Sequence, residues 1–178
     1  MLIVEPNAHA IVVFAKEPTA GAVKTRLIPD IGAIAATAVY ESLLEQALTC
    51  AAHTPVTGRY LYAEGAPVDG MLAVRSATLG LELRQQRGHG LGERMYLALE
   101  ETMAQHARVV LIGSDCPEYT PEYVLAALDA LKHNDVVVGP AHDGGYVLLA
   151  LRQLDERLFE GIAWSTGAVL DQTRERLR

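Results

Sequence analysis

Short apolar runs alternate along the chain with longer segments in which apolar residues recur every three or four positions. The first pattern is typical of buried strands, and the second is typical of helices that cover a sheet. The predicted strands are residues 11–15, 59–63, 82–86, 109–113, 135–139 and 146–151. The predicted helices are residues 33–52, 91–106 and 120–132, and a last helix that Ser165 or Thr166 caps and that ends at residue 176. The stretch between residues 63 and 82 is expected to be a loop.

This order of elements predicts an α/β fold, with three α/β/α layers around a mostly parallel central sheet. The strands lack the clean alternation of a sheet with one wet face, so helices are expected on both faces. The chain has 178 residues without a linker, a low-complexity tract or an internal repeat, which suits a single domain over residues 1–178. In such sheets, ligands bind outside the carboxyl ends of the strands, where the strand order reverses.

The composition of the chain argues against some classes of binding partner. Half of the residues are hydrophobic and the net charge is −7, which argues against nonspecific binding to nucleic acid or to an anionic membrane, since both need a broad basic surface. The chain has no run of about 18 apolar residues, so we expect no membrane span. Residues 1–6 lack the features of a signal peptide, and Cys50 and Cys116 lack CxxC spacing. We therefore expect a cytoplasmic protein with reduced, buried cysteines.

The loop after the first predicted strand gathers positive charge against this acidic background. It contains Lys16, Lys24 and Arg26, which directly follow an apolar run. Lysine offers a point charge and arginine a planar fork, and both suit phosphate oxygens. Gly21 allows a tight turn and a close approach of the backbone to a ligand. The loop matches neither the Walker pattern nor GxGxxG. The alternative interpretation is a basic loop in contact with solvent only.

Two aspartates stand at corresponding places after later strands. Asp115 follows the apolar run of residues 109–113, and Asp143 precedes Gly144 and Gly145 between the last two predicted strands. An ionised carboxylate at the edge of a core needs a cation or hydrogen-bond donors. Mg²⁺ or Mn²⁺, held by one or two carboxylates and by the phosphates of a ligand, would satisfy both. The paired glycines let backbone amides approach that ligand. The alternative is that each aspartate caps a turn.

Two further segments are weaker candidates. Residues 88–95 form a glycine-rich entry to a helix, whose N-terminus is able to bind an anion, so they are a candidate for contacts to the base, the ribose or the acceptor, or else a flexible loop. Trp164, Ser165 and Thr166 offer an aromatic platform with hydroxyls, or else a core tryptophan beside a helix cap. The histidines show no zinc spacing, and we interpret His142 as a surface residue.

Together, these segments resemble a bacterial family of GT-A-like transferases, often labelled radical-SAM- or selenodomain-associated transferases and predicted glycosyltransferases. The resemblance covers nearly the whole chain and rests on residues 14–27, 91–95, 112–117, 139–146 and 162–166. The family looks like a distant relative of molybdenum-cofactor guanylyltransferases and of 2-phospholactate guanylyltransferase. It therefore implies a GT-A fold that binds a nucleotide diphosphate.

Position by position, the resemblance implies that Lys16, Lys24 and Arg26 contact the phosphates of the donor. Asp115 would be the metal aspartate that stands in for the Asp-x-Asp motif of many glycosyltransferases. Asp143 would be the second acidic ligand, or it would orient the acceptor. The implied donor is a nucleotide sugar or an NTP, and the acceptor is an unspecified small molecule.

The leading hypothesis is a Mg²⁺- or Mn²⁺-dependent glycosyltransferase in which Lys24, Asp115 and Asp143 carry the catalysis. The same groups would serve a nucleotidyltransferase, in which a phosphorylated acceptor attacks an NTP and pyrophosphate leaves. A nucleotide-binding domain without catalysis and a metal-free phosphosugar binder are the other hypotheses. A homodimer through an exposed sheet edge is considered as well.

Overall fold

The structure is a computed structural model that describes residues 8–65, 67 and 69–177. The residues that carried the expectation of no signal peptide, 1–6, lie outside the described residues. The strands are β1 (His9–Lys16), β2 (Gly58–Glu64), β3 (Glu82–Gln85), β4 (Arg108–Ile112), β5 (Val136–Pro140) and β6 (Tyr146–Leu151). The helices are α1 (Ile28–His53), α2 (Met71–Leu79), α3 (Leu91–Met103), α4 (Pro121–Ala130) and α5 (Val169–Arg176), with short 3₁₀ turns η1 (Thr25–Leu27) and η2 (Glu156–Leu158).

The strands form one mostly parallel sheet of six strands in the order β3-β2-β1-β4-β6-β5. β1 pairs in parallel with β2 and with β4, whereas β6 runs antiparallel to both β4 and β5. From β1 the chain continues to the β2 side of the sheet, and after β4 it builds the other side. The strand order therefore reverses between β1 and β4, and the predicted site segments follow these two strands.

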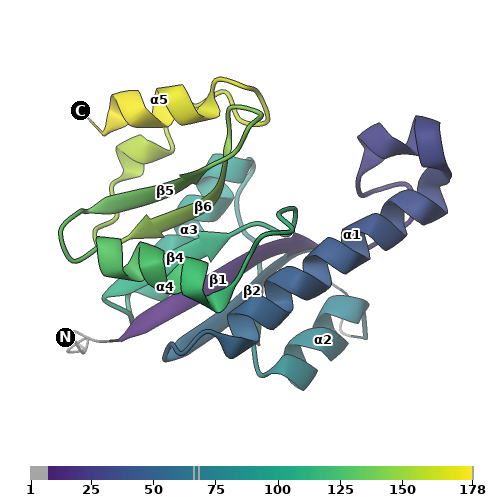
Figure 1. Ribbon diagram of the computed structural model, residues 1–178, viewed down its shortest axis with the longest axis horizontal. Helices are drawn as coiled ribbons and strands as arrows, with labels where there is room; N and C mark the ends of the chain where they lie inside the picture. Colours follow the sequence, from purple (N-terminus) through teal and green to yellow (C-terminus); the bar gives the residue numbers. More distant parts are fainter. Residues whose placement is uncertain (1–7, 66, 68, 178) are drawn as a thin grey trace.

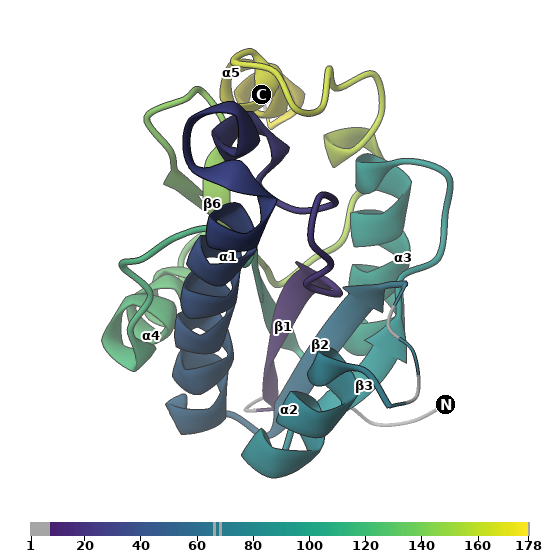
Figure 2. The ribbon, with the colours of Figure 1, turned by 90° about the vertical axis from the view of Figure 1, so that its right-hand side faces the viewer.

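Helices cover both faces of the sheet, which confirms the predicted three-layer arrangement (Figure 1). α1, α2 and α4 pack on one face through a cluster that includes Leu44, Leu72 and Val124. α3 and η2 pack on the other face through a second cluster. In Figure 2, β1 and β2 lie between α1 on the left and α3 on the right. Successive side chains of a strand point to opposite faces, and β1 supplies both clusters in this way. Because helices cover both faces of the sheet, a ligand can reach the sheet only at the ends of its strands.

α1 contains the predicted helix of residues 33–52 and begins five residues before it. Gly32 has a non-helical backbone with φ of 80°, which separates a short first turn from the main helix. The main helix buries Tyr40, Leu44 and Leu48 against the sheet, while Ile31 and Ile34 are exposed. In Figure 1 the beginning of α1 projects beyond the sheet, next to the loop that follows β1.

By length and composition alone, the segment Thr25–His53 would be able to cross a membrane. Its most apolar window has a mean hydropathy of 1.4 and is 22% buried. Core helices of proteins that never enter a membrane pass the same test, and the main helix of this segment packs on the sheet. The expectation that the chain does not span a membrane therefore stays a prediction.

The expectation of a loop between residues 63 and 82 is wrong, because α2 lies there. Leu72 and Ser76, one turn apart, are buried against the core. The first backbone amides of the helix donate to the carboxylate of Glu17, from Met71 N to Oε1 over 2.5 Å and from Leu72 N to Oε2 over 3.3 Å. Glu17 lies just after β1, so the cap that helps this helix begin comes from a distant part of the chain.

The predicted cap of the last helix is also wrong. The N-cap of α5 is Ala168, which has no side chain able to cap it. Thr166 Oγ1 instead accepts a hydrogen bond from Ala168 N over 3.3 Å, and Ser165 takes a left-handed backbone with φ of 64°. These two hydroxyl residues therefore shape the loop before the helix. By contrast, Thr120 caps α4 as predicted, since its side chain accepts from Tyr123 N.

Candidate functional site

A cleft of about 790 Å³ opens at the carboxyl ends of the parallel strands, where the strand order reverses. It collects the segments that the sequence singled out. The predicted site residues that line it are Lys16, Lys24, Arg26, Asp115, Asp143 and Gly145. Gly21 and Gly144 belong to the same two loops but are not among the lining residues. The cleft therefore brings together all of the predicted charged side chains.

Lys24 and Asp115 meet inside this cleft, although they belong to different segments. Lys24 Nζ lies 3.2 Å from Asp115 Oδ1, and the two side chains are 22% and 64% exposed. Lys24 also has a left-handed backbone with φ of 47°, which is uncommon for a residue with a Cβ. Such conformations cost about 1–3 kcal/mol and cluster at functional sites. The loop is therefore held in a conformation that aims Lys24 at the carboxylate of Asp115.

Tyr40, a residue that the sequence analysis did not select, ties the ends of β1 and β4 together. Its hydroxyl accepts from Lys16 N over 2.9 Å, donates to Lys16 O over 3.0 Å, and accepts from Ser114 Oγ over 3.2 Å. This uses the full hydrogen-bonding capacity of the hydroxyl, and burial raises its pKa. Tyr40 thus fixes the backbone directly before the cationic loop and directly before Asp115.

Glu64 and Arg94 extend the charged lining of the cleft. Glu64 was missed, whereas Arg94 belongs to the segment of residues 88–95 that the sequence offered as a weaker candidate. Glu64 Oε2 lies 3.0 Å from Lys16 Nζ and 2.8 Å from Arg94 Nη1. Burial opposes ionisation of Glu64, but its hydrogen bonds and charge interactions with Lys16 and Arg94 hold its pKa below its usual range. A signal was present in the sequence, because Glu64 directly follows the predicted strand of residues 59–63 and Arg94 lies in the glycine-rich segment of residues 88–95.

The loop between β5 and β6 presents Asp143 to the cleft. Asp143 Oδ1 accepts from Gly145 N over 3.1 Å, which orients the carboxylate. Gly144 has φ of 83°, and a Cβ there would lie 2.1 Å from Gly167 O. Its carbonyl accepts from Leu170 N over 2.8 Å. The second of the paired glycines thus faces the cleft, while the first lets this loop pack tightly against the loop before α5.

The donor atoms present fit a hard divalent cation. Asp115 and Asp143 supply carboxylate oxygens to one cleft, and the described residues contain no group of three or more His, Cys, Asp or Glu arranged to hold a metal. Mg²⁺ is usually bound by one or two carboxylates, with the phosphates of a substrate and water completing the shell. A partial ligand set of this kind therefore suits a metal that arrives with a diphosphate.

Trp164, which the sequence offered either as an aromatic platform for a ligand or as a core residue, has both roles in the structure. Trp164 is half-buried and lines the cleft. Its ring meets that of Tyr146 edge to face, with 6.4 Å between centroids. A Cβ on Gly92 would lie 2.4 Å from Trp164 Nε1, so this glycine makes room for the indole. Trp164 is therefore both packed and available to a ligand.

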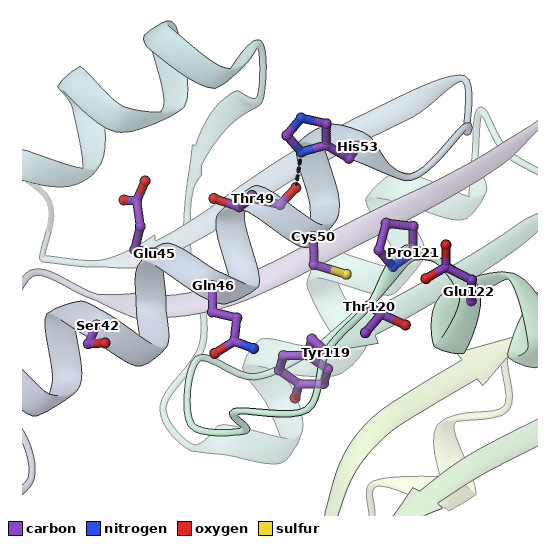
Figure 3. Close-up of a pocket in the computed structure, with 10 residues that line it drawn as sticks. All are labelled: Ser42, Glu45, Gln46, Thr49, Cys50, His53, Tyr119, Thr120, Pro121 and Glu122. Atoms are coloured by element: carbon purple, nitrogen blue, oxygen red, sulfur yellow. Dashed lines mark hydrogen bonds between the residues drawn. The ribbon is translucent and has the colours of Figure 1, made fainter.

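A second hollow, of about 510 Å³, lies between α1 and the beginning of α4 (Figure 3). Its lining includes Cys50 and His53 but none of the residues selected as a site. His53 Nδ1 lies 2.8 Å from Thr49 O, and Gln46 donates to Pro117 O, so these polar groups serve the fold. We assign function to the cleft at the strand ends, because there cations and carboxylates converge.

Comparisons with known proteins agree with this fold. The family model described as "Uncharacterized protein conserved in bacteria (DUF2064)" matches residues 44–166. The chain is similar to a crystal structure from Desulfovibrio desulfuricans G20 named a putative nucleotide-diphospho-sugar transferase, with 35% identity and a TM-score of 0.83 over 96% of this chain and 75% of that one. No curated protein matched.

A second solved structure shows the fold alone. It is the 4-diphosphocytidyl-2C-methyl-D-erythritol synthase of Anaerococcus prevotii DSM 20548, which is 13% identical with a TM-score of 0.62 over 96% of this chain and 84% of that one. The fold class inferred from the sequence is thus confirmed. The chain has the three-layer α/β/α arrangement, and it shares this fold with the structure named a nucleotide-diphospho-sugar transferase. The comparisons show no association with radical-SAM or selenoprotein domains.

Proposed function

The chain belongs to the DUF2064 family, and from this premise we propose that it is a Mg²⁺- or Mn²⁺-dependent glycosyltransferase that uses a nucleotide-sugar donor. The observation that carries the proposal is the convergence of Lys16, Lys24 and Arg26 with Asp115 and Asp143 in one cleft at the strand-order reversal. The 35% identical relative, whose name describes a transferase of this kind, supports it.

The cationic loop would bind the diphosphate of the donor. Lys24 and Arg26 both line the cleft, and their charges oppose the negative charge that develops on the departing nucleotide diphosphate. Stabilisation of this kind is usually the largest single contribution to catalysis, because it acts in a preorganised site. Asp115 balances the charge of Lys24, with Oδ1 3.2 Å from Nζ. A donor phosphate would compete with this carboxylate for Lys24 and leave it available.

Asp115 would hold the metal, and Asp143 would either complete its protein ligands or orient the acceptor. When bound, the cation supplies Lewis-acid stabilisation of the diphosphate leaving group. The buried Ser114 directly before Asp115 donates its side-chain hydroxyl to Tyr40, which would anchor the segment that carries this carboxylate. Glu64 and Arg94 would complete the polar floor on which the donor rests.

The first test is a thermal-shift screen of GTP, CTP, UTP, ATP and the common nucleotide sugars, each with Mn²⁺ and with EDTA. A ligand that binds only the native state stabilises it by about 2.7 kcal/mol at a hundredfold excess over Kd. We expect a Mn²⁺-dependent rise in melting temperature with one nucleotide sugar, followed by release of its nucleoside diphosphate on addition of acceptor pools.

Other outcomes separate the competing functions. A shift with an NTP alone, followed by pyrophosphate release, would replace the proposal with nucleotidyl transfer. A shift that survives EDTA unchanged would show that binding does not require the metal. Binding without turnover over a broad acceptor panel would indicate a nucleotide-binding domain, and no shift with any ligand would refute the assignments that use a nucleotide.

A further inference from the structure

The lining of the cleft divides into two chemically different parts. The part contributed by the loop after β1 and by α3 carries all of its lysines and arginines: Lys16, Lys24, Arg26 and Arg94. The part contributed by residues 141–169 includes no lysine or arginine among its described lining residues. Its polar side-chain groups include the carboxylate of Asp143 and the hydroxyls of Ser165 and Thr166, whereas the Tyr146 hydroxyl is buried. We call this second part the neutral wall, because Asp143 is the one acidic or basic side chain among its described lining residues.

The neutral wall is built rather than incidental. Trp164 and Tyr146 pack edge to face, and Gly92 of α3 leaves space for the indole. Ser165 and Thr166 are exposed beside these rings. The wall thus presents an aromatic surface and the uncharged hydroxyls of Ser165 and Thr166.

Ser165 is exposed on this wall and has an uncommon backbone conformation, with φ of 64°. Of the non-glycine residues that the structure describes, only Lys24 and Ser165 have a positive φ, and both line the cleft. The left-handed conformation costs energy that no helix cap recovers, because the cap of α5 lies elsewhere. The Ser165 hydroxyl has no hydrogen-bond partner among the described residues, whereas Thr166 Oγ1 donates to Ala163 O over 2.7 Å. Ser165 is therefore available to a bound molecule.

We infer that the neutral wall, formed by residues 164–167 with Tyr146 and Asp143, binds the acceptor, and that this acceptor is an uncharged, hydroxyl-bearing molecule of the sugar or polyol class. This inference rests on the proposed function and names its second substrate. A phosphorylated acceptor would place a second anion beside residues that offer it no positive charge, and a desolvated anion without a charged partner is costly. A sugar instead offers apolar C–H faces to the aromatic rings and hydroxyls to Ser165.

An acceptor bound to the neutral wall could react with the donor by glycosyl transfer. The hydroxyl oxygen of the acceptor forms a bond to the anomeric carbon of the donor, and the bond from that carbon to the diphosphate oxygen breaks. The nucleoside diphosphate leaves with the bonding electron pair and is held by Lys24 and Arg26. The proton of the acceptor hydroxyl leaves to a base, and the Asp143 carboxylate stands on the neutral wall for that role.

Trp164 provides a direct probe of this surface, because it is the only tryptophan of the chain. Its fluorescence would be titrated in the presence of Mg²⁺ and a saturating amount of the nucleoside diphosphate of the donor that the thermal-shift screen identifies, so that the cationic loop is already occupied. The titrants are matched pairs that differ by one phosphate: glycerol and glycerol 3-phosphate, glucose and glucose 6-phosphate, inositol and inositol 1-phosphate. We expect a saturable change with at least one neutral member and binding at least about tenfold weaker for its phosphorylated partner, a ratio equal to about 1.4 kcal/mol. Equal or tighter binding of the phosphorylated partners, or no response to any pair, would overturn the inference.

A pair of variants at Ser165 separates a binding role from a structural one. Ser165→Gly tolerates the positive φ but removes the hydroxyl, so it should weaken the neutral ligand about fivefold while the protein stays folded. Ser165→Asn also tolerates this conformation and restores a polar group, so it should recover most of the affinity. Thr78→Gly, on the exposed side of α2, is the control for a nonspecific effect on fluorescence. Equal affinity in Ser165→Gly and wild type would remove Ser165 from the site.

The failure of this inference can be told apart from the failure of the proposed function. The thermal shift with nucleotide sugars reports on the cationic loop and does not require an acceptor. If that shift is present and the phosphorylated partners bind better, the proposed donor stands and the acceptor class is wrong. If the shift is absent for every nucleotide, the proposed function itself fails.

Discussion

The two ends of the parallel strands use polar residues in opposite ways. At the carboxyl ends, Lys24 and Asp115 form an ion pair in an open cleft, and Asp115 remains 64% exposed. At the amino ends, His106 is only 8% exposed, and its Nε2 lies 2.8 Å from the Tyr60 hydroxyl. Thr57 lies on the other side of the same ring, with Oγ1 3.4 Å from Nδ1. One end leaves its charges accessible, and the other encloses its polar groups.

This difference separates residues that are expected to act in ligand binding or turnover from residues that stabilise the fold. The side chains of Thr57, Tyr60 and His106 at the amino ends hydrogen-bond to one another, so their removal should cost stability. The charged groups at the carboxyl ends line an open cleft, so their removal should cost binding or turnover and leave the fold nearly unchanged. Each prediction below tests on which side of this division a residue falls.

The largest effect is expected for Asp115→Asn. Loss of the carboxylate removes the proposed metal ligand, and we expect turnover to fall by about 100-fold or more, as for other groups that stabilise developing charge. The free energy of unfolding should change by less than about 1 kcal/mol, because the pair with Lys24 is solvent-exposed on the Asp115 side. Donor turnover and urea melts of the same preparation measure the two quantities.

Asp135→Asn is the matched control for this change. Asp135 also forms an exposed ion pair, with Oδ1 2.6 Å from Arg152 Nε, but it lies outside the cleft lining. Its turnover should equal that of wild type. If both variants lose activity alike, or if Asp115→Asn unfolds the protein, the division between the two strand ends does not hold.

Most of the framework could be predicted from the sequence, because local pattern determines it. The apolar run that becomes β4 is continuous, and a strand of this kind is buried on both faces. Asp115 stands just beyond it, and the carboxyl ends of parallel strands meet at one edge of the sheet, so its nearness to Lys24 follows from topology. The convergence of the cationic loop with both aspartates was therefore predictable before any contact was seen.

The features that sequence reasoning missed depend on contacts between distant segments. The start of α2 is capped by Glu17, which no local pattern around residue 71 reveals. Tyr40 reads as one more apolar residue of a helix, and only the fold brings its hydroxyl to Lys16 and Ser114. Glu64 becomes a functional candidate only once β2 and α3 are placed beside each other, because its partner Arg94 lies in the glycine-rich segment of residues 88–95.

At the amino ends, Gly58→Ala should have the next largest effect, and it should act on stability. A Cβ at this position would lie 2.5 Å from His106 Nε2 and 2.8 Å from a ring carbon of Tyr60. Since both rings are buried, the clash disturbs their hydrogen bond, and overpacking of this kind costs about 1–3 kcal/mol. Gly113→Ala is the control for urea melts, because its Cβ would approach no closer than 4.0 Å to Tyr119 Oη. Equal melts for the two variants would contradict the prediction.

Tyr40→Phe tests whether one residue can contribute both to stability and to turnover, because Tyr40 is buried but supports the sheet edge where the cleft lies. Loss of its hydroxyl leaves Lys16 N and O and Ser114 Oγ without this partner, so the unfolding free energy should fall by about 1–3 kcal/mol. Turnover should fall severalfold as well, because the loop and Asp115 lose their common anchor. Tyr96→Phe, which removes a hydroxyl bonded to the exposed Glu100 at 3.2 Å, should change neither. A normal turnover in Tyr40→Phe would confine Tyr40 to the fold.

The smallest effect is the dependence of stability on pH that arises at the amino ends. Burial, with the charge of Arg84 and then of His9, lowers the pKa of His106; burial, with the charge of Arg108, lowers that of His9. The neutral forms are thus favoured in the folded state, and the unfolded chain binds more protons below its ordinary histidine pKa of about 6.5. Stability from these residues is present above that value and is lost as the pH falls toward their folded-state pKa.

Urea melts at pH 7.5 and 5.5 should show this loss of stability. His106→Gln should reduce the loss, because glutamine keeps hydrogen-bonding groups near Tyr60 and Thr57 but does not titrate. The exposed His133→Gln should leave the difference unchanged, and an identical pH dependence in all three proteins would mean that the enclosed histidines at the amino ends do not couple to folding.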